Sequence, residues 1–561
     1  VARLLHPHKR TLWGKLKQLF RTFQLEWQLD KKEILQLYLN IAPFGGTIEG
    51  VEAASYTYLN KPSKELTHAE AALLAVLPQA PTRYRPDFNS KKAQAARDKV
   101  LKRLAKFGVW SYDEINAAML EKVYSFNYKP EAVAPLLSRR LISHSDGQAV
   151  VKSTINRDIQ VSMQELANAY VKQMPVNTSA AILIVENKSM AVKAYIGTAD
   201  FASNNRYGFV DMVEAIRSPG STLKPFIYGL ALDEGLIHSH SLLADVPRTW
   251  GNYRPANFSG KFNGPVSAHD ALQRSLNVPA VDLLERYGAN KFVAKLQNAG
   301  LALKIPRRQP NLSIILGGAG TSLERLVASY TALANEGMTG DLKFQVKELD
   351  EPIRKKYLMS PEAAWIVNHT LAGISRPESI NHYSASDSKG VLAWKTGTSY
   401  GFRDSWAIGV NSKYTIGVWL GRPDGSAVPG HYGRVTAGPL LFNIADYLGL
   451  EYSQLPKPQK VTQTDICWPT GTLTKELDSN LCHQTHTAWL INQTAPPTWH
   501  FADTDVWLGN IFNFWVNPES KLRVSMSCKA VKKQKVQIAV WPKVTEPWLT
   551  YNLRRSSTIT S

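Results

Sequence analysis

Three short motifs stand in an order that can build a serine acyl-transfer site. They are Ser221-Thr222-Leu223-Lys224, Ser275-Leu276-Asn277 and Lys395-Thr396-Gly397-Thr398. An ordered S-x-x-K, S-x-N and K-T-G series is typical of enzymes whose serine attacks a peptide-like carbonyl. Each motif alone is a weak signal, and the chain also carries an S-x-x-K at 386–389 and an S-x-N at 203–205. Only the first set has this order and is followed by a single K-T-G.

The S-x-x-K motif is predicted to open a helix. The residues 217–220 favour a turn, and the apolar spacing from Leu223 to Ala231 then predicts a helix that ends near Gly235. Lys224 would lie one turn from Ser221, within side-chain reach. A lysine can serve as the base only when burial and nearby positive charge lower its pKa. The alternative is a helix-capping serine followed by a solvated lysine, and the other two motifs decide against it.

The other two motifs are expected beside the first. Ser275 and Asn277 are predicted at a junction between a helix and a loop, where the hydroxyl could relay a proton and the amide could hold Lys224. The alternative for Asn277 is a C-terminal helix cap. The K-T-G motif is predicted on a strand, where an extended peptide could add along the edge and Lys395 could attract a carboxylate. Its alternative is an edge strand protected by its lysine.

The surrounding pattern predicts several domains. Residues 1–120 have helical spacing, and Thr67 with Glu70 forms a capping box. Later residues predict a strand hairpin over 180–196, a helix over 323–334 capped by Thr321 with Glu324, and strands over 391–398, 406–410 and 414–420. This order favours an α/β domain with a mainly antiparallel sheet. We expect domains at 1–120 and 179–455, a linker at 121–178 and a small β-rich segment at 456–561.

Composition narrows the possible partners. The chain has 561 residues and a net charge of +20. This charge suits anionic partners, although a generally basic solvated surface explains it equally well. No zinc-finger spacing or RNA-binding aromatic signature points to nucleic acid. The glycine-rich residues 317–320 lack the G-K-S/T of a phosphate loop, so tight packing beside the active-site strand is favoured.

The cysteines, the apolar runs and the first residue of the chain are also informative. Cys467, Cys482 and Cys528 lie in the last fifth of the chain, without C-x-x-C metal spacing. A Cys467–Cys482 disulfide and free buried thiols both remain possible. No apolar run approaches the roughly 20 residues that span a bilayer. The chain begins at Val1 inside patterned sequence, so we expect it to lack its true N-terminus.

Residues around the three motifs resemble the penicillin-binding transpeptidase domain over about 135–450. The matching stretches are 217–226, 275–280, 394–400 and 404–406. The resemblance implies that the D-Ala-D-Ala end of a peptidoglycan stem acylates Ser221, with Lys224 as base. It assigns proton relay and positioning to Ser275, Asn277 and Lys395, and substrate binding to Thr396, Gly397 and Thr398. The N–H groups of Ser221 and Thr398 would form the oxyanion hole, no cofactor or metal is implied, and β-lactams would acylate the same serine.

The N-terminal region resembles the glycosyltransferase of bifunctional (class A) penicillin-binding proteins. The stretches 25–26, 31–35, 38–40, 45–61 and 70–81 carry this resemblance, and residues 42–45 with 467–469 point to the 1C type. It implies a mainly α lobe that uses a lipid-linked precursor at the periplasmic face of the bacterial inner membrane, with a divalent cation possible in an intact enzyme. The remnant site residues would be Lys15, Glu26, Lys31 and Asn40. The family's first catalytic motif is absent and Gln18 replaces a common Glu, so we expect no glycan polymerisation by this chain and a membrane anchor outside it.

The composition of residues 9–23 suggests contact with a membrane, independently of any family resemblance. Basic residues alternate with large apolar ones; they are Lys9, Arg10, Lys15, Lys17 and Arg21 with Trp13, Leu16, Leu19, Phe20 and Phe23. A basic amphipathic helix of this kind can lie on an anionic membrane surface. Packing against its own lobe, with a solvated basic face, is the equally good alternative.

Other acyl-enzymes share the three motifs. A class A β-lactamase would add an E-x-x-L-N motif, which is absent between Asn277 and Lys395. A D,D-carboxypeptidase would keep every site residue, and a penicillin-binding sensor or scaffold would keep the serine without turnover. Sensors of that type carry several membrane spans, and this sequence contains none; the glycosyltransferase resemblance favours a peptidoglycan D,D-transpeptidase over the carboxypeptidase.

Overall fold

The computed structural model describes residues 1–8, 11–46, 48–124, 133–143, 150–377, 392–451, 453–499, 511–527 and 532–556. The chain divides into two compact units, Val1–Ala132 and Val133–Ser561. The division falls inside the segment 121–178 that the sequence predicted as a linker. No helix in the described ranges is both long and apolar enough to cross a bilayer.

The first unit is mainly helical, as predicted. Its helices are α1 (Ala2–Leu5), α2 (Leu12–Gln28), α3 (Lys31–Ile41), α4 (Val51–Leu59), α5 (His68–Val76), α6 (Pro86–Lys106) and α7 (Tyr112–Leu120), with the short strands β1 (Pro43–Gly45) and β2 (Ile48–Glu49). The predicted capping box of α5 is confirmed, because Thr67 accepts from the N–H of Glu70 and the Glu70 side chain accepts from the N–H of Thr67. Leu73 and Leu74 of this helix are buried in the core of the unit.

A five-stranded antiparallel sheet forms the centre of the second unit, which confirms the predicted fold class. Its strands are β3 (Ser179–Glu186), β4 (Ala191–Ile196), β9 (Ala393–Thr398), β10 (Asp404–Val410) and β11 (Tyr414–Gly421), in the order β4-β3-β11-β10-β9. Side chains alternate across a strand. Ile182 and Ile184 of β3 therefore enter one core, whereas Leu183 and Val185 enter another. Burial on both faces explains why β3 is apolar almost throughout.

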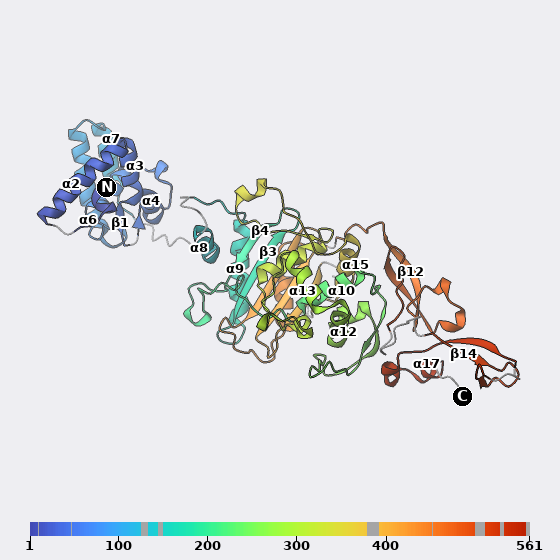
Figure 1. Ribbon diagram of the computed structural model, residues 1–561. Coiled ribbons are helices and arrows are strands. Elements are labelled where there is room, and N and C mark those ends of the chain that lie inside the picture. Colours follow the sequence, from blue (N-terminus) through green and yellow to red (C-terminus); the bar gives the residue numbers. More distant parts are fainter. Residues whose placement is uncertain are drawn as a thin grey trace. The chain divides into compact units, whose positions relative to one another are not determined.

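Helices cover both faces of this sheet (Figure 1). One face carries α9 (Arg157–Lys172) and α16 (Gly433–Tyr447); the other packs on α14 (Leu323–Tyr330) and α15 (Pro361–Ala372) and the helices behind them, α10 (Lys224–Asp233), α11 (Ala268–Gln273), α12 (Asn277–Tyr287) and α13 (Ala289–Asn298). The helix α8 (Pro135–Ser143) is fixed to this unit by Arg140, which donates to the Glu324 carboxylate on α14 at 2.6 and 3.0 Å. Because α10 and α12 pack together next to β9, the three motifs can meet.

The predicted cap of α14 is wrong by one residue. Ser322, not Thr321, has the extended backbone of an N-cap, and its hydroxyl accepts from the N–H of Arg325 at 3.3 Å. Thr321 instead pairs its backbone with Arg217. Either residue type can cap a helix. The long-range pairing with Arg217, which the local sequence does not reveal, decides between them.

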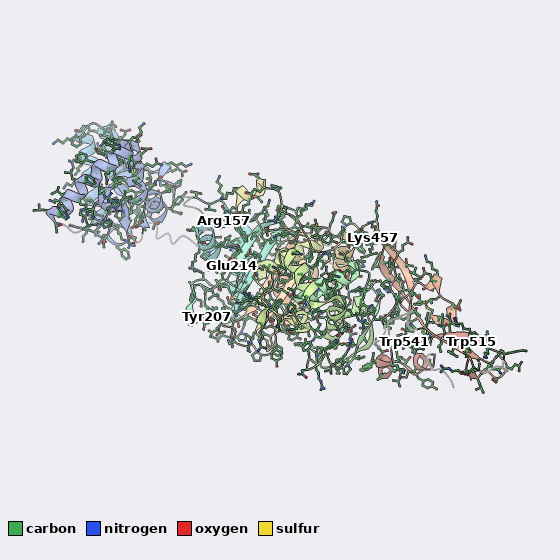
Figure 2. All side chains as sticks on the ribbon, in the orientation of Figure 1. Arg157, Tyr207, Glu214, Lys457, Trp515 and Trp541 are labelled. Carbon is green, nitrogen blue, oxygen red and sulfur yellow. A yellow bond between two sulfur atoms is a disulfide. The ribbon has the colours of Figure 1, made fainter. Side chains whose placement is uncertain are left out.

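Small β elements complete the second unit. They are β5 (Leu242–Asp245), β6 (Gly264–Ser267), β7 (Met338–Thr339), β8 (Lys356–Tyr357), β12 (Val461–Trp468), β13 (Gln484–Ile491), β14 (Ile511–Val516), β15 (Arg523–Val524) and β16 (Gln534–Ala539), followed by α17 (Tyr551–Ser556). The Cys467–Cys482 disulfide closes the β12–β13 hairpin, and Cys528 lies outside the described residues. Trp541, labelled in Figure 2, is buried in a small core with Trp468. The predicted β-rich C-terminal segment is therefore present.

Candidate active site

Ser221 lies in a tight turn that leads into α10. Residues Gly220–Leu223 form a 3₁₀ turn, and α10 begins at Lys224. The expected position just before a helix is therefore correct, but the first turn is 3₁₀ rather than α. Pro225 stands in the opening turn of α10, where its missing N–H leaves no helical bond unmade.

The S-x-N motif lies between two helices. Ser275 follows α11, and Asn277 is the first residue of α12. The predicted position after a helix is correct for Ser275, which lies in a turn, but the chain then enters α12 rather than a longer loop, so Asn277 is not a C-terminal cap. Pro279, which suggested the loop, stands within the first turn of α12, where proline is tolerated. Ser275 itself has a φ of +57°, a left-handed conformation that turns the chain between the two helices.

Lys224 joins the first motif to the second. Its Nζ donates to the backbone oxygen of Ser275 at 2.6 Å and to Asn277 Oδ1 at 2.6 Å, and it lies 3.4 Å from Ser275 Oγ. The lysine is fully buried. Within the described part of the chain, Ser221 Oγ has no hydrogen-bond partner. The structure thus holds Lys224 on the S-x-N motif and leaves the serine hydroxyl available.

Lys395 joins the third motif to the second. Its Nζ donates to Ser275 Oγ at 2.8 Å and to the backbone oxygen of Thr396 at 2.9 Å. Ser275 therefore stands between two lysine side chains, each within hydrogen-bond reach of its hydroxyl. The three predicted motifs form one cluster. Of the two competing motifs, 203–205 occupies a separate turn and 386–389 lies outside the described residues.

The two lysines have strongly altered acidity. Burial, and then the positive charge of Lys395, lower the pKa of Lys224 well below its ordinary value, while Asp245 acts in the opposite direction. Burial, and then the charge of Arg434, lower the pKa of Lys395 to about 7. A lysine whose pKa is brought toward neutrality can carry a neutral amine and accept a proton. The site therefore contains two amines able to exchange protons with Ser275.

The turn Gly220–Leu223, here named the Ser221 turn, and the K-T-G strand approach closely because both contain glycine. Gly220 has a φ of +53°, and a Cβ there would lie 2.7 Å from the Thr398 nitrogen. A Cβ on Gly397 would lie 2.7 Å from Thr222 Cγ2 and would overlap the carbonyl oxygen of Pro219. This contact brings the backbones on either side of Ser221 against β9. In the described sheet, β9 pairs only with β10, and its other edge faces the Ser221 turn.

A second layer of contacts supports the turn. Ser218 accepts from the indole N–H of Trp406 at 2.8 Å through its carbonyl oxygen, and its hydroxyl donates to the Gly317 carbonyl oxygen at 2.8 Å. A Cβ on Gly317 would lie 2.9 Å from the backbone of Gly220. The prediction that the 317–320 glycines serve tight packing is therefore confirmed, although Gly317 packs on the Ser221 turn whereas Gly318 packs on Ser313 and Gly320 on Ile216. Tyr330 donates its hydroxyl to the carbonyl oxygen of Thr222 at 2.5 Å.

Sequence reasoning missed two residues behind the S-x-N motif. Asn257 accepts from the N–H of Asn277 at 2.8 Å through its Oδ1, and its Nδ2 donates to both oxygens of Asp245 at 2.8 Å. Both residues are buried. Neither belongs to a motif recognisable in a single sequence. The only available signal was an aspartate at the end of an apolar run, which is too common to indicate a site.

The predicted glycosyltransferase residues are only partly brought together. Glu26 on α2 and Lys31 on α3 form an exposed ion pair. Lys15 lies on α2 and Asn40 on α3, and among the described residues neither side chain has a hydrogen bond or ion pair with that pair. The contact between Glu26 and Lys31 is consistent with a shared site but does not define one.

The basic amphipathic stretch forms α2 and exposes its apolar side chains. Leu12 and Trp13 are about four-fifths exposed, at 84% and 78%, and Leu16, Leu19, Phe20 and Phe23 are more than half exposed. Gly14 is its single buried residue. Lys9 and Arg10 lie outside the described residues. Both alternatives for this stretch, contact with a membrane surface and packing against its own lobe, stay predictions.

Comparison with known proteins gives matches along the chain. Family models match as Transglycosylase over 1–105, Penicillin binding protein transpeptidase domain over 180–433, Penicillin-binding protein 1C linker domain over 460–490 and its second linker domain over 505–557. Penicillin-binding protein 1C of Escherichia coli (strain K12) is 46% identical over 99% of this chain and 71% of its own length. Penicillin-binding protein 1F of Bacillus subtilis (strain 168) is 28% identical over 74% of this chain, which spans 61% of that relative. The crystal structure of Penicillin-Binding Protein 1A from Haemophilus influenzae has the same fold, with a TM-score of 0.61, 18% identity and coverage of 84% of this chain and 93% of that chain.

Proposed function

The chain belongs to the penicillin-binding protein 1C family, and from that membership we propose that its second unit is a serine D,D-transpeptidase with Ser221 as nucleophile. The family and its matched domains assign the chain to peptidoglycan synthesis and transpeptidation. The observation that carries the finer proposal is the cluster of Lys224, Ser275, Asn277 and Lys395 against the Ser221 turn.

In the first half of the reaction, the donor stem acylates Ser221. Lys224 in its neutral form takes the proton of Ser221 Oγ, and the oxygen attacks the carbonyl carbon between the two D-Ala residues. The negative charge that develops on the carbonyl oxygen is met by the N–H groups of Ser221 and Thr398, which the close approach of Gly220 to Thr398 supports. The C–N bond then breaks, and the departing D-Ala amine takes the proton that Lys224 gained, passed through Ser275.

In the second half, an amine of another stem attacks the ester carbonyl. The attacking amine passes one proton to the neutral Lys224, the new amide forms as the bond to Ser221 Oγ breaks, and Lys224 returns that proton to the serine oxygen. Water in place of the amine would give a D,D-carboxypeptidase with the same residues, and a stalled ester would give a penicillin-binding sensor or scaffold. Every step uses protein side chains and backbone, so we propose this reaction without a cofactor.

A stem-pentapeptide assay tests the proposal. The protein is supplied with a donor ending in D-Ala-D-Ala and an amine acceptor, and mass spectrometry separates the cross-linked product from the hydrolysed one. We expect a cross-linked product that disappears in Ser221→Ala and in Lys224→Met. Hydrolysis alone, at saturating acceptor, would favour the carboxypeptidase. Release of D-Ala that is unchanged in Ser221→Ala would reject the acyl-enzyme.

We further propose that α2 contacts an anionic membrane surface carrying the lipid-linked precursor, on the periplasmic side. The exposed apolar residues of α2, interleaved with Lys15, Lys17 and Arg21, support this. Burial of such side chains in a lipid interface and attraction to anionic headgroups act together. Flotation with vesicles of phosphatidylglycerol should recover the chain, and Trp13→Ser with Phe20→Ser should weaken recovery. Equal recovery of that variant, or of the wild type with neutral phosphatidylcholine vesicles, would count against this surface.

A further inference from the structure

The strongest unexplained feature of the second unit is a buried carboxylate behind the S-x-N motif. Asp245, the last residue of β5, has no exposed surface. It accepts from Asn257 Nδ2 at 2.8 Å, from the N–H of Asn263 at 2.9 Å and from Asn263 Nδ2 at 2.5 Å. All its partners are neutral donors, and among the described residues no lysine or arginine is paired with it. A buried charge of this kind is costly, so its retention calls for an explanation.

The carboxylate fixes which way the amide of Asn257 points. An ionised carboxylate only accepts hydrogen bonds, so Asn257 must turn its nitrogen toward Asp245. Its oxygen is then left to accept from the N–H of Asn277 at 2.8 Å. The Asp245 carboxylate therefore determines that Asn257 presents its oxygen to the backbone N–H of Asn277, the first residue of α12.

The same loop fixes the amide of Asn277. Asn277 Nδ2 donates to the carbonyl oxygen of Ala256 at 2.6 Å, and Ala256 is the neighbour of Asn257 in the chain. The Asn277 oxygen is thereby directed to Lys224 Nζ at 2.6 Å. A reversed amide would place two donors together at the lysine and two acceptors together at Ala256. Asp245 thus sets the orientation of the Asn257 amide, and the neighbouring Ala256 carbonyl oxygen sets that of the Asn277 amide.

We propose that Asp245 and Asn257 are positioning residues that hold Asn277, and through it Lys224, in the orientation needed for acylation of Ser221. This inference rests on the proposed role of Lys224 as base. The two residues act through Asn277 and touch neither substrate nor Ser221 in this scheme. Their function is to keep the base in place while it gains and loses a proton.

The charge of Asp245 also acts on the acidity of the base. It raises the pKa of Lys224, against the lowering by burial and by Lys395. Lys395 on β9 and Asp245 on β5 are the charged groups that act on Lys224. Burial, then the charges of Asp245 and Asp282, raise the pKa of Tyr228 on α10, and burial, then His269, lower the pKa of His369 on α15. Removal of the Asp245 charge therefore leaves Lys224 easier to deprotonate but less firmly held.

The test is the rate constant for acylation by a fluorescent penicillin, measured from pH 5 to pH 10. In Asp245→Asn we expect the plateau rate to fall roughly 10- to 100-fold, because a displaced base costs rate steeply. We also expect the acidic limb of the profile to move to lower pH by roughly one unit, because an attractive charge is lost. Asp245→Glu, which keeps the charge, should return the acidic limb to its wild-type position.

Two further variants separate positioning from simple stability. Asn257→Leu keeps the volume and the Asp245 charge, so it should lose rate without moving the acidic limb. Asp282→Asn is the matched control, since Asp282 is also buried but is paired with Arg248 and Arg286. It should lower the melting temperature and leave both the plateau and the acidic limb unchanged.

Several outcomes would overturn the inference. A wild-type profile in Asp245→Asn would do so, as would a loss of rate in Asn257→Leu no larger than in Asp282→Asn. If Asp245→Asn does not fold, Asn257→Leu decides the positioning role alone. Absence of Ser221-dependent acylation in the wild type is a different result, because it would reject the proposed function whatever the variants do.

Discussion

Gly220→Ala most sharply tests the close approach between the Ser221 turn and the K-T-G strand. Gly220 has a φ of +53°, and the added Cβ would lie 2.7 Å from the Thr398 nitrogen and closer to the Thr398 carbonyl oxygen. Both obstacles are backbone atoms of β9, which is held on its other side by β10. The strand or the turn must therefore move.

The size of the effect follows from this geometry. The left-handed conformation costs an alanine roughly 1–2 kcal/mol. Ordinary contact with the Thr398 nitrogen, near 3.4 Å, needs a further separation of about 0.7 Å. That movement pulls the Thr398 N–H away from the Ser221 N–H. Loss of one oxyanion donor costs roughly 100- to 1,000-fold in rate. We therefore expect acylation about 100-fold slower in Gly220→Ala.

The assay is the second-order rate constant for acylation by a fluorescent penicillin, with the melting temperature measured on the same samples. Gly235→Ala is the matched control, because Gly235 lies just after the same helix with a φ of +65° and open space around its Cβ position. Gly235→Ala introduces the cost of a left-handed backbone without a collision between the added Cβ and a neighbouring atom. It should lose stability by roughly 1 kcal/mol and keep its acylation rate.

Two results would refute the reasoning. Wild-type acylation in a folded Gly220→Ala protein would mean that the approach of the turn to Thr398 is not needed for the chemistry. An equal loss of rate in Gly235→Ala would mean that backbone strain, rather than the collision with β9, explains the effect.

Other predictions concern the charge, the pH dependence of stability and the disulfide. Lys395→Gln removes the positive charge that lowers the pKa of Lys224, so the acidic limb of the acylation profile should move to higher pH, opposite to Asp245→Asn; an unmoved limb would contradict the coupling of the two lysines. Burial lowers the pKa of His238 to about 4, and its Nε2 bonds to the Gly471 carbonyl oxygen, so between pH 6.5 and pH 4 the unfolded chain binds more protons than the folded one. The free energy of unfolding should then fall by about 3 kcal/mol as pH falls through this window, and His238→Asn should remove that part of the slope in melts at fixed pH values. Removing the disulfide with Cys467→Ala and Cys482→Ala should destabilise the β12–β13 hairpin by about 3 kcal/mol, as expected for a loop of 15 residues. Hydrogen exchange would detect this, and unchanged protection of the hairpin amides would contradict it.

Local pattern was enough to predict much of the transpeptidase unit. The strands around the K-T-G motif, the turn before α10 and the capping box at Thr67 depend on neighbours within a few residues, and the structure contains all three. The meeting of Ser221, Ser275 and Lys395 was predicted from motif order and resemblance. Ser275 lies 54 residues after Ser221, and Lys395 lies 120 residues after Ser275, so spacing in the sequence could not place them in one site. The packing of α10, α12 and β9 brings them together.

The errors have a common physical cause. Asn277 was expected beside a loop because Pro279 follows it, but proline suits the first turn of a helix as well as a loop. Thr321 was expected to cap α14, but its backbone is already paired with Arg217. Asp245 and Asn257 were not predicted at all, because their importance lies in partners distant in the sequence. For Asn277 and Thr321, local sequence allowed two structures; for Asp245 and Asn257, it gave no signal, and all four residues have contacts distant in the sequence.

The central claim is that Ser221 is the acylated nucleophile, and intact-protein mass spectrometry tests it most directly. The wild type and Ser221→Ala are incubated with a labelled penicillin at saturating concentration, and the adduct is located by peptide mapping. We predict one adduct per chain, on the peptide that contains Ser221, and none in Ser221→Ala with an unchanged melting temperature. An adduct on another residue, or an equal adduct in Ser221→Ala, would contradict the account.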